Sequence, residues 1–302
     1  MAAVAMGTRQ GDVARMAQDA SAAEGLHLAA MRAGEGDGVA QDWDAAFDCL
    51  LQAAELGHEL SQAELAALAG DWPLADRVAQ DQTIAAGVCR GLRARIDIGA
   101  LLASPPPGIL SSAPRVATIQ KFATPEVCNW LIARAKPKLG RAKIWDPATG
   151  GPGHERSRDN SEHHFVLEDS DCVLAVLRAR IAGVTELPVA AMEAPAVLHY
   201  LPGQQFLPHY DFLDTAHEGY AKEVAEHGQR VVTFLMCLND DYEGGETQFP
   251  ALGRRFKGRL GSAIFFWNVT PEGEPDRQTV HAGLPPTRGE KWLLSQWIRE
   301  RG

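Results

Sequence analysis

Three consecutive prolines, Pro105 to Pro107, separate two parts of the chain that differ in composition. Proline has a fixed φ and no backbone N–H, so this stretch ends any helix and predicts a stiff linker, which we place at residues 104–114. Residues 14–103 are rich in Ala, Leu, Glu, Gln and Arg, which are good helix formers. We therefore expect a helical region at 14–103 and a second domain, built from short β-like runs, at 115–302.

The helical region contains a repeated pattern. Residues 28–31 (LAAM) and 65–68 (LAAL) are nearly identical and lie 37 residues apart, a period typical of helix-pair repeats. The stretch from Gly34 to His58 resembles one Sel-like unit of the TPR class followed by the start of a second. An Ala-rich helical bundle without repeats is the alternative. Stacked helix pairs commonly present a concave face, so this region is a candidate surface for a protein partner.

Composition and charge exclude several classes of protein. Hydrophobic residues make up 45% of the chain, which is typical of a globular protein rather than a disordered one. A net charge of −10 disfavours non-specific binding to nucleic acid. No apolar run reaches the roughly 18 residues of a membrane span. The five cysteines form no CxxC pair, which favours thiols in a reducing compartment. We therefore expect a cytoplasmic protein with neither nucleic acid nor membrane as partner.

The second domain is predicted to be mainly β, with two early helices. Thr124 and Pro125 are typical of a helix start, and residues 171–182 predict a second helix. Residues 214–229 are polar and are expected to form a partly helical surface excursion. Strands are predicted at 196–201, 206–212, 230–238, 247–249, 262–267, 278–282 and 291–298. Many short strands without long helices between them indicate a sandwich or barrel, and with the helices an α+β protein.

Two histidines and one aspartate in the β region form a metal-binding pattern. His209 and Asp211 are two residues apart in a predicted strand, so their side chains point to the same face. His281 lies in a later strand of the same domain. Two His and one carboxylate form the facial triad that binds non-haem Fe(II) and leaves positions open. A 2-oxoglutarate cosubstrate and O2 would fill these positions, and Lys291 is suitably placed to pair with the distal carboxylate of 2-oxoglutarate.

Residues 115–300 resemble the prolyl 4-hydroxylase type of Fe(II)/2-oxoglutarate oxygenase. The matching motifs occur in the order and spacing of that family, at 119–128 (IQKFATPEVC), 200–211 (YLPGQQFLPHYD), 230–235 (RVVTFL), 244–250 (GGETQFP) and 281–298. The resemblance implies a double-stranded β-helix, a distorted jelly roll related to the cupins, with flanking helices. This fold agrees with the predicted strands.

The resemblance also implies roles for individual residues. His209, Asp211 and His281 would bind iron and carry the catalysis. Lys291 would pair with the distal carboxylate of 2-oxoglutarate. Thr233 would add a hydrogen bond to the cosubstrate, if its hydroxyl faces the same pocket.

Other residues match the family's pattern less specifically or depart from it. Tyr200 matches a tyrosine near the cosubstrate or substrate, and Trp297 a tryptophan close to the site; core packing is the alternative for both. Arg158 lies in a polar stretch that borders the substrate groove in the family, with a solvated loop as the alternative. Phe206 and Cys237 each stand where many relatives have a tyrosine. Each position lacks the tyrosine hydroxyl, so the polar lining of the pocket is expected to differ. This difference bears on the identity of the substrate more than on iron binding.

The function implied is hydroxylation of a C–H bond, coupled to decarboxylation of 2-oxoglutarate. The expected cofactors are Fe(II), 2-oxoglutarate and O2, with ascorbate as a candidate additional reductant. A prolyl residue of a peptide or protein is the first candidate substrate, and a free amino acid or other small molecule is the second. A non-catalytic scaffold with a degenerate oxygenase domain is the alternative of a different class, which the intact His209, Asp211, His281 and Lys291 disfavour.

Overall fold

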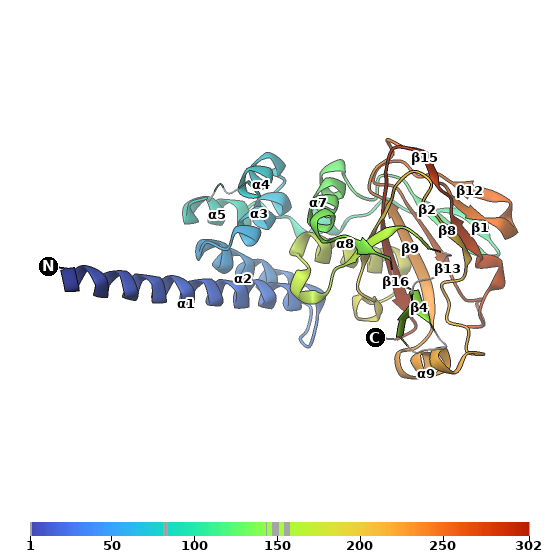
Figure 1. Ribbon diagram of the computed structural model, residues 1–302, viewed down its shortest axis with the longest axis horizontal. Coiled ribbons are helices and arrows are strands. Elements are labelled where there is room, and N and C mark those ends of the chain that lie inside the picture. Colours follow the sequence, from blue (N-terminus) through green and yellow to red (C-terminus); the bar gives the residue numbers. More distant parts are fainter. Residues whose placement is uncertain are drawn as a thin grey trace. The chain divides into compact units, whose positions relative to one another are not determined.

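The computed structural model describes residues 2–80, 82, 84–142, 144–146, 151–153 and 158–301 (Figure 1). The chain forms two compact units. One consists of Met1–Ala103 with Leu167–Ala179, and the other of Ser104–Val166 with Arg180–Gly302. None of the helices in the described ranges is both long enough and apolar enough to cross a membrane.

The first unit is helical, as predicted, and its first helix begins well before residue 14. Its helices are α1 (Ala2–Glu35), α2 (Trp43–Glu55), α3 (Glu59–Leu68), α4 (Trp72–Val78), α5 (Ala86–Arg93) and α6 (Ile98–Leu102), together with the first part of α8 (Cys172–Thr185). Aspartates start three of them, because the side chains of Asp42, Asp71 and Asp97 accept a hydrogen bond from the N–H three residues further on. Helix α1 packs on α2, and α3 packs on α4.

Residues 167–179 belong to the helical unit although they lie far along the chain. The fully buried Glu64 carboxylate accepts hydrogen bonds from His27, at 2.7 Å, and from the backbone N–H of Cys172, at 2.6 Å. A buried carboxylate is costly unless it is paired in this way. The predicted helix at 171–182 is therefore present as α8. Its first part belongs to the helical unit, which apart from residues 167–179 lies entirely before residue 104.

The second unit is built on two antiparallel sheets. The large sheet has the order β1-β2-β13-β9-β16-β7-β6-β3, and the small sheet has the order β12-β11-β14-β8. The strands of the large sheet are β1 (Gly108–Ser112), β2 (Arg115–Ile119), β3 (Gly140–Arg141), β6 (Ser161–His164), β7 (Ala196–Tyr200), β9 (Arg230–Cys237), β13 (Ala263–Trp267) and β16 (Lys291–Arg299). Those of the small sheet are β8 (Phe206–His209), β11 (Thr247–Phe249), β12 (Arg254–Phe256) and β14 (His281–Gly283). Helices and antiparallel sheets together confirm the α+β class.

Two further strand pairs and helices α7 and α9 also belong to this unit. The pairs are β4 (Ile144–Asp146) with β5 (Gly151–Gly153), and β10 (Glu243–Gly244) with β15 (Pro286–Arg288). Helix α7 (Pro125–Ala135) begins where predicted, with Thr124 accepting from the N–H of Val127. Helix α9 (Glu218–His227) occupies the polar stretch 214–229 and buries none of its residues, so the expected partly helical surface excursion is present.

The segment expected as a linker is structured along part of its length. Residues 108–112 form β1, which pairs with β2 at the edge of the large sheet. The prolines precede this strand, so the extended backbone that they favour leads directly into sheet pairing. The irregular connection is therefore shorter than the predicted 104–114.

The core of this unit brings the two sheets together. Leu198, Leu235 and Leu293 from the large sheet pack in one buried cluster with Phe249 from the small sheet. Side chains alternate along a strand, so these residues share the inner face of their sheets. The same inner face supplies the walls of the cavity described below.

We predict that the turn before β13 depends on Gly261. Its φ is +72°, and a Cβ there would lie 2.0 Å from the carbonyl oxygen of Ala123. Gly261→Ala should therefore lower the free energy of unfolding by more than about 2 kcal/mol. Gly253→Ala is the matched control, since Gly253 also has a positive φ but open space around it, and should cost about 1 kcal/mol. Urea unfolding followed by tryptophan fluorescence measures both, and equal losses would contradict the steric argument.

Candidate metal and cosubstrate site

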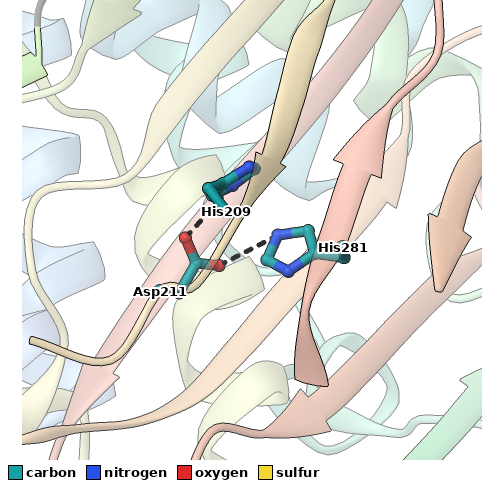
Figure 2. A group of neighbouring side chains, drawn as sticks. All are labelled: His209, Asp211 and His281. Atoms are coloured by element: carbon teal, nitrogen blue, oxygen red, sulfur yellow. Dashed lines mark ion pairs between the residues drawn. The ribbon is translucent and has the colours of Figure 1, made fainter. Parts of the chain in front are cut away.

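Strand pairing in the small sheet brings the predicted metal ligands together. His209 is the last residue of β8 and His281 is the first residue of β14, and the two are direct partners in the antiparallel register. Asp211 lies in the bend just after β8, whereas the predicted strand continued to residue 212. The three side chains nevertheless converge, and Figure 2 shows the Asp211 carboxylate facing both imidazole rings.

The geometry of this group fits a single metal ion. One ligand atom from each residue can be chosen so that all lie within 4.8 Å of one another. The Asp211 Oδ1 atom is 3.6 Å from His209 Nε2, and Oδ2 is 3.4 Å from His281 Nε2. Within the described residues this is the one group of His, Cys, Asp or Glu side chains that meets this criterion.

Backbone carbonyls orient both imidazoles. His209 Nδ1 lies 2.8 Å from the carbonyl oxygen of Leu207, and His281 Nδ1 lies 3.0 Å from that of Thr279. A carbonyl can only accept, so each Nδ1 donates and each neutral ring keeps a lone pair on Nε2. Both lone pairs point towards the Asp211 carboxylate. Three electron-rich groups facing one another are the donor set of a cation site, and their chemistry fits Fe(II).

The charge states of these groups suit a divalent cation. Burial alone would raise the pKa of the Asp211 carboxyl, but His281 and His209 hold it well below its usual range. Burial, and the neighbouring His281, lower the pKa of His209. An ionised carboxylate beside a neutral imidazole is thus favoured around neutral pH, which is the state in which these groups bind metals.

The three residues line a cavity of about 560 Å³ that also contains Lys291. Lys291 begins β16 and lies opposite Tyr200 of β7 in the sheet register. It is only 2% exposed, with its Nζ atom 5.1 Å from the centre of the Tyr200 ring. It forms no ion pair with any residue in the described ranges, and burial lowers its pKa to about 8. A buried cation without an anion is costly, so this end of the cavity is suited to a ligand carboxylate.

The structure places the Thr233 hydroxyl between two polar side chains. Its hydroxyl donates to Asp211 Oδ2 at 2.7 Å and accepts from Asn268 Nδ2 at 2.9 Å. Thr233 is fully buried and is not among the residues that line the cavity. The single proton of this hydroxyl is therefore directed to the Asp211 carboxylate, and a hydrogen bond from Thr233 to the cosubstrate stays a prediction.

The structure places Tyr200, Arg158 and Trp297 on the cavity wall. Burial raises the pKa of Tyr200 to about 12, so its phenol remains protonated and can donate. Arg158 is buried rather than solvated, and its guanidinium pairs with Glu162 at 2.5 Å. The Arg230 guanidinium lies 3.6 Å above the Trp297 ring. Polar groups thus interrupt a largely apolar wall.

Two other residues near the metal ligands bear on the site. Phe206 stacks on His209 with ring centres 3.5 Å apart, and the Arg158 guanidinium lies 4.8 Å from the centre of the Phe206 ring. The tyrosine hydroxyl missing at this position therefore leaves an apolar surface beside a metal ligand. Thr247 also lines the cavity. Its sequence neighbourhood gives no chemical signal, because the preceding Gly244 and Gly245 are typical of a turn.

Comparison with known proteins agrees with this site. The sequence model of the 2OG-Fe(II) oxygenase superfamily matches residues 195–299, which include the two histidines, Asp211 and Lys291. Fold and site thus define an oxygenase that uses Fe(II) and 2-oxoglutarate.

Two plant relatives narrow the class. Probable prolyl 4-hydroxylase 3 of Arabidopsis thaliana is 34% identical over 210 residues, covering 63% of this chain and 71% of the relative. Prolyl 4-hydroxylase 13 of the same plant is 34% identical over 221 residues, covering 68% and 78%. The viral collagen prolyl hydroxylase of Paramecium Bursaria Chlorella virus-1, solved with 2OG, is 28% identical with a TM-score of 0.47, covering 61% of this chain and 95% of that one. The chain belongs to the prolyl 4-hydroxylase family of 2OG-Fe(II) oxygenases.

We predict that His281→Ala abolishes tight metal binding. The substitution removes one of three converging ligands, so the affinity for Mn(II), a stand-in for Fe(II), should fall by more than about 100-fold. The exposed His227 of α9 offers the control, since His227→Ala leaves the triad intact. Calorimetric titration of the metal-free protein measures both. Unchanged affinity in His281→Ala would show that the metal binds elsewhere.

The lowered pKa of Lys291 predicts how 2-oxoglutarate binding depends on pH. Below about pH 8 the ammonium is already protonated, so this group leaves the affinity unchanged. Above it, binding the ligand carboxylate requires uptake of a proton, and the affinity should fall by about tenfold per pH unit. Lys291→Met should bind weakly and without this dependence. Titration of the Mn(II)-loaded protein from about pH 6.5 to 9.5 tests this, and a flat wild-type profile would contradict it.

Proposed function

We propose that this protein hydroxylates a prolyl residue of a peptide or protein, with 2-oxoglutarate as cosubstrate and with Fe(II) held by His209, Asp211 and His281. The observation that carries the proposal is the pairing of two features in one cavity. A triad of converging donors lies with Lys291, a buried cation that has no ion-pair partner within the described residues. Iron and a dicarboxylate would each satisfy one of these features.

The protein's contribution to the reaction is to position and shield the reactants. When bound, Fe(II) supplies the redox chemistry that couples the decarboxylation of 2-oxoglutarate by O2 to insertion of oxygen into a C–H bond. Lys291 would hold the distal carboxylate, and the phenol of Tyr200 beside it would donate a hydrogen bond. Leu198, Leu235 and Leu293 line the cavity with apolar surface.

The substrate class rests on the family and on the cavity wall. The named relatives are prolyl 4-hydroxylases. Trp297 offers an aromatic surface suited to a proline ring, and the Arg158–Glu162 pair offers polar groups suited to a peptide backbone. A free amino acid or other small molecule is the competing substrate class. The intact donor triad and Lys291 argue against a non-catalytic scaffold.

We propose a further role for the helical unit, that of a Sel-like array binding a protein partner or substrate. The two similar segments, 28–31 and 65–68, lie near the ends of α1 and α3, which are the first helices of the pairs α1–α2 and α3–α4. This position supports a repeat. We also propose a cytoplasmic location, which is supported by five cysteines that are all free thiols.

The function is tested by mass spectrometry of product. The full-length protein with Fe(II), 2-oxoglutarate and ascorbate would be incubated either with proline-containing peptides or with free proline, under ¹⁸O2. We expect one ¹⁸O atom per hydroxylated prolyl residue in a peptide and equimolar succinate, with none from His281→Ala. Hydroxylation of free proline alone would favour the small-molecule alternative. Absence of 2-oxoglutarate turnover in a protein that binds iron would contradict the enzymatic assignment.

A further inference from the structure

Two buried side chains that do not line the cavity form a chain of hydrogen bonds that ends at the Asp211 carboxylate. Thr233 Oγ1 lies 2.7 Å from Asp211 Oδ2, and Asn268 Nδ2 lies 2.9 Å from Thr233 Oγ1. Thr233 and Asn268 are both fully buried. Neither residue has surface exposed to solvent, so the donors of both side chains are expected to find acceptors within the protein.

Hydrogen-bond chemistry fixes the direction of this chain. The amide nitrogen of Asn268 can only donate, so the Thr233 hydroxyl accepts from it and directs its one proton to Asp211. Rotating the amide by half a turn would set two acceptors, the amide oxygen and the carboxylate, against one hydroxyl proton. The observed orientation leaves Asn268 Oδ1 without a hydrogen-bond partner among the described residues. The donor role of the amide therefore dominates at this position.

The backbone holds both residues in place. Thr233 lies within β9 and is paired with Phe266 of β13 on one side and with Trp297 of β16 on the other. The backbone N–H of Asn268 donates to Val231 at 2.8 Å. Asp211, in contrast, lies beyond the last residue of β8, so no strand pairing fixes its side chain. The hydrogen bond from Thr233 supplies that constraint from the large sheet.

We infer that Thr233 and Asn268 are positioning residues for the metal, a conclusion that rests on the proposed iron site. Their chain of hydrogen bonds restricts the Asp211 carboxylate to the orientation that faces His209 and His281. A hydroxyl that donates to one carboxylate oxygen also occupies one of its lone pairs. These hydrogen bonds thereby limit the orientations in which the carboxylate can coordinate a metal ion together with the two imidazoles.

Metal binding by full-length variants tests this inference without relying on turnover. Thr233→Val keeps the shape of the side chain and removes the hydroxyl, so the Kd for Co(II) should rise by about 10- to 100-fold. Thr233→Ser restores the donor and should stay within about threefold of the wild type. Asn268→Ala should give an intermediate loss, because the hydroxyl can still reach Asp211 but is no longer oriented. The visible spectrum of bound Co(II) should change in Thr233→Val and return in Thr233→Ser.

Thr185→Val is the matched control. Thr185 is also a buried threonine of this unit, and its hydroxyl donates to the carbonyl of Ile181 in α8. The substitution should lower stability without changing Co(II) affinity. A Thr233→Val protein that binds Co(II) as tightly as the wild type would overturn the inference, as would Thr233→Ser binding as weakly as Thr233→Val. If Thr233→Val does not fold, wild-type affinity in Asn268→Ala overturns it. Failure of the wild type to bind any metal would instead contradict the proposed function.

Discussion

The pairing of β8 with β14 is the constraint on which the site depends. It sets His209 directly opposite His281, so that two side chains more than seventy residues apart in sequence share one edge of the small sheet. Because the side-chain period of a strand is two residues, a slip of one residue in either strand would turn an imidazole away from the cavity. Each ring is oriented by the backbone carbonyl two residues before its own histidine. Register therefore determines both the position and the tautomer of the nitrogen ligands.

The large sheet contributes further residues of the site. It carries Thr233, which orients Asp211, and Lys291, which is buried beside Tyr200. Taking a lysine out of water without a counter-charge destabilises a fold, and the lowered pKa of Lys291 expresses that cost. The charge is retained in a cavity that also contains a cation site. Binding of a dicarboxylate would relieve the unpaired charge, and we regard this as the physical basis for selecting 2-oxoglutarate.

The sequence was sufficient to predict the metal ligands and Lys291. It did not predict which side chains form hydrogen bonds with one another in the folded protein. His209 and Asp211 were predicted as ligands because residues two apart in a strand point to the same face, although β8 ends before Asp211. His281 and Lys291 were predicted because they lie in later strands of the same domain. The hydrogen bond from Thr233 to Asp211 was not predicted, because sequence shows which face a hydroxyl occupies but not which acceptor is nearest. Asn268 and Thr247 carried no pattern of their own. The return of residues 167–179 to the helical unit depends on a buried carboxylate 108 residues away, which no local signal reports.

The central claim is that one cavity binds Fe(II) through the triad and 2-oxoglutarate between the metal and Lys291. A keto acid chelated to Fe(II) gives a visible charge-transfer absorption, so anaerobic spectroscopy of the full-length protein tests the claim most directly. The account predicts a band that appears only when Fe(II) and 2-oxoglutarate are both present, saturates at one equivalent of each, and requires more 2-oxoglutarate in Lys291→Met. Tight binding of both components without such a band would contradict the claim, since iron and cosubstrate would then occupy separate sites.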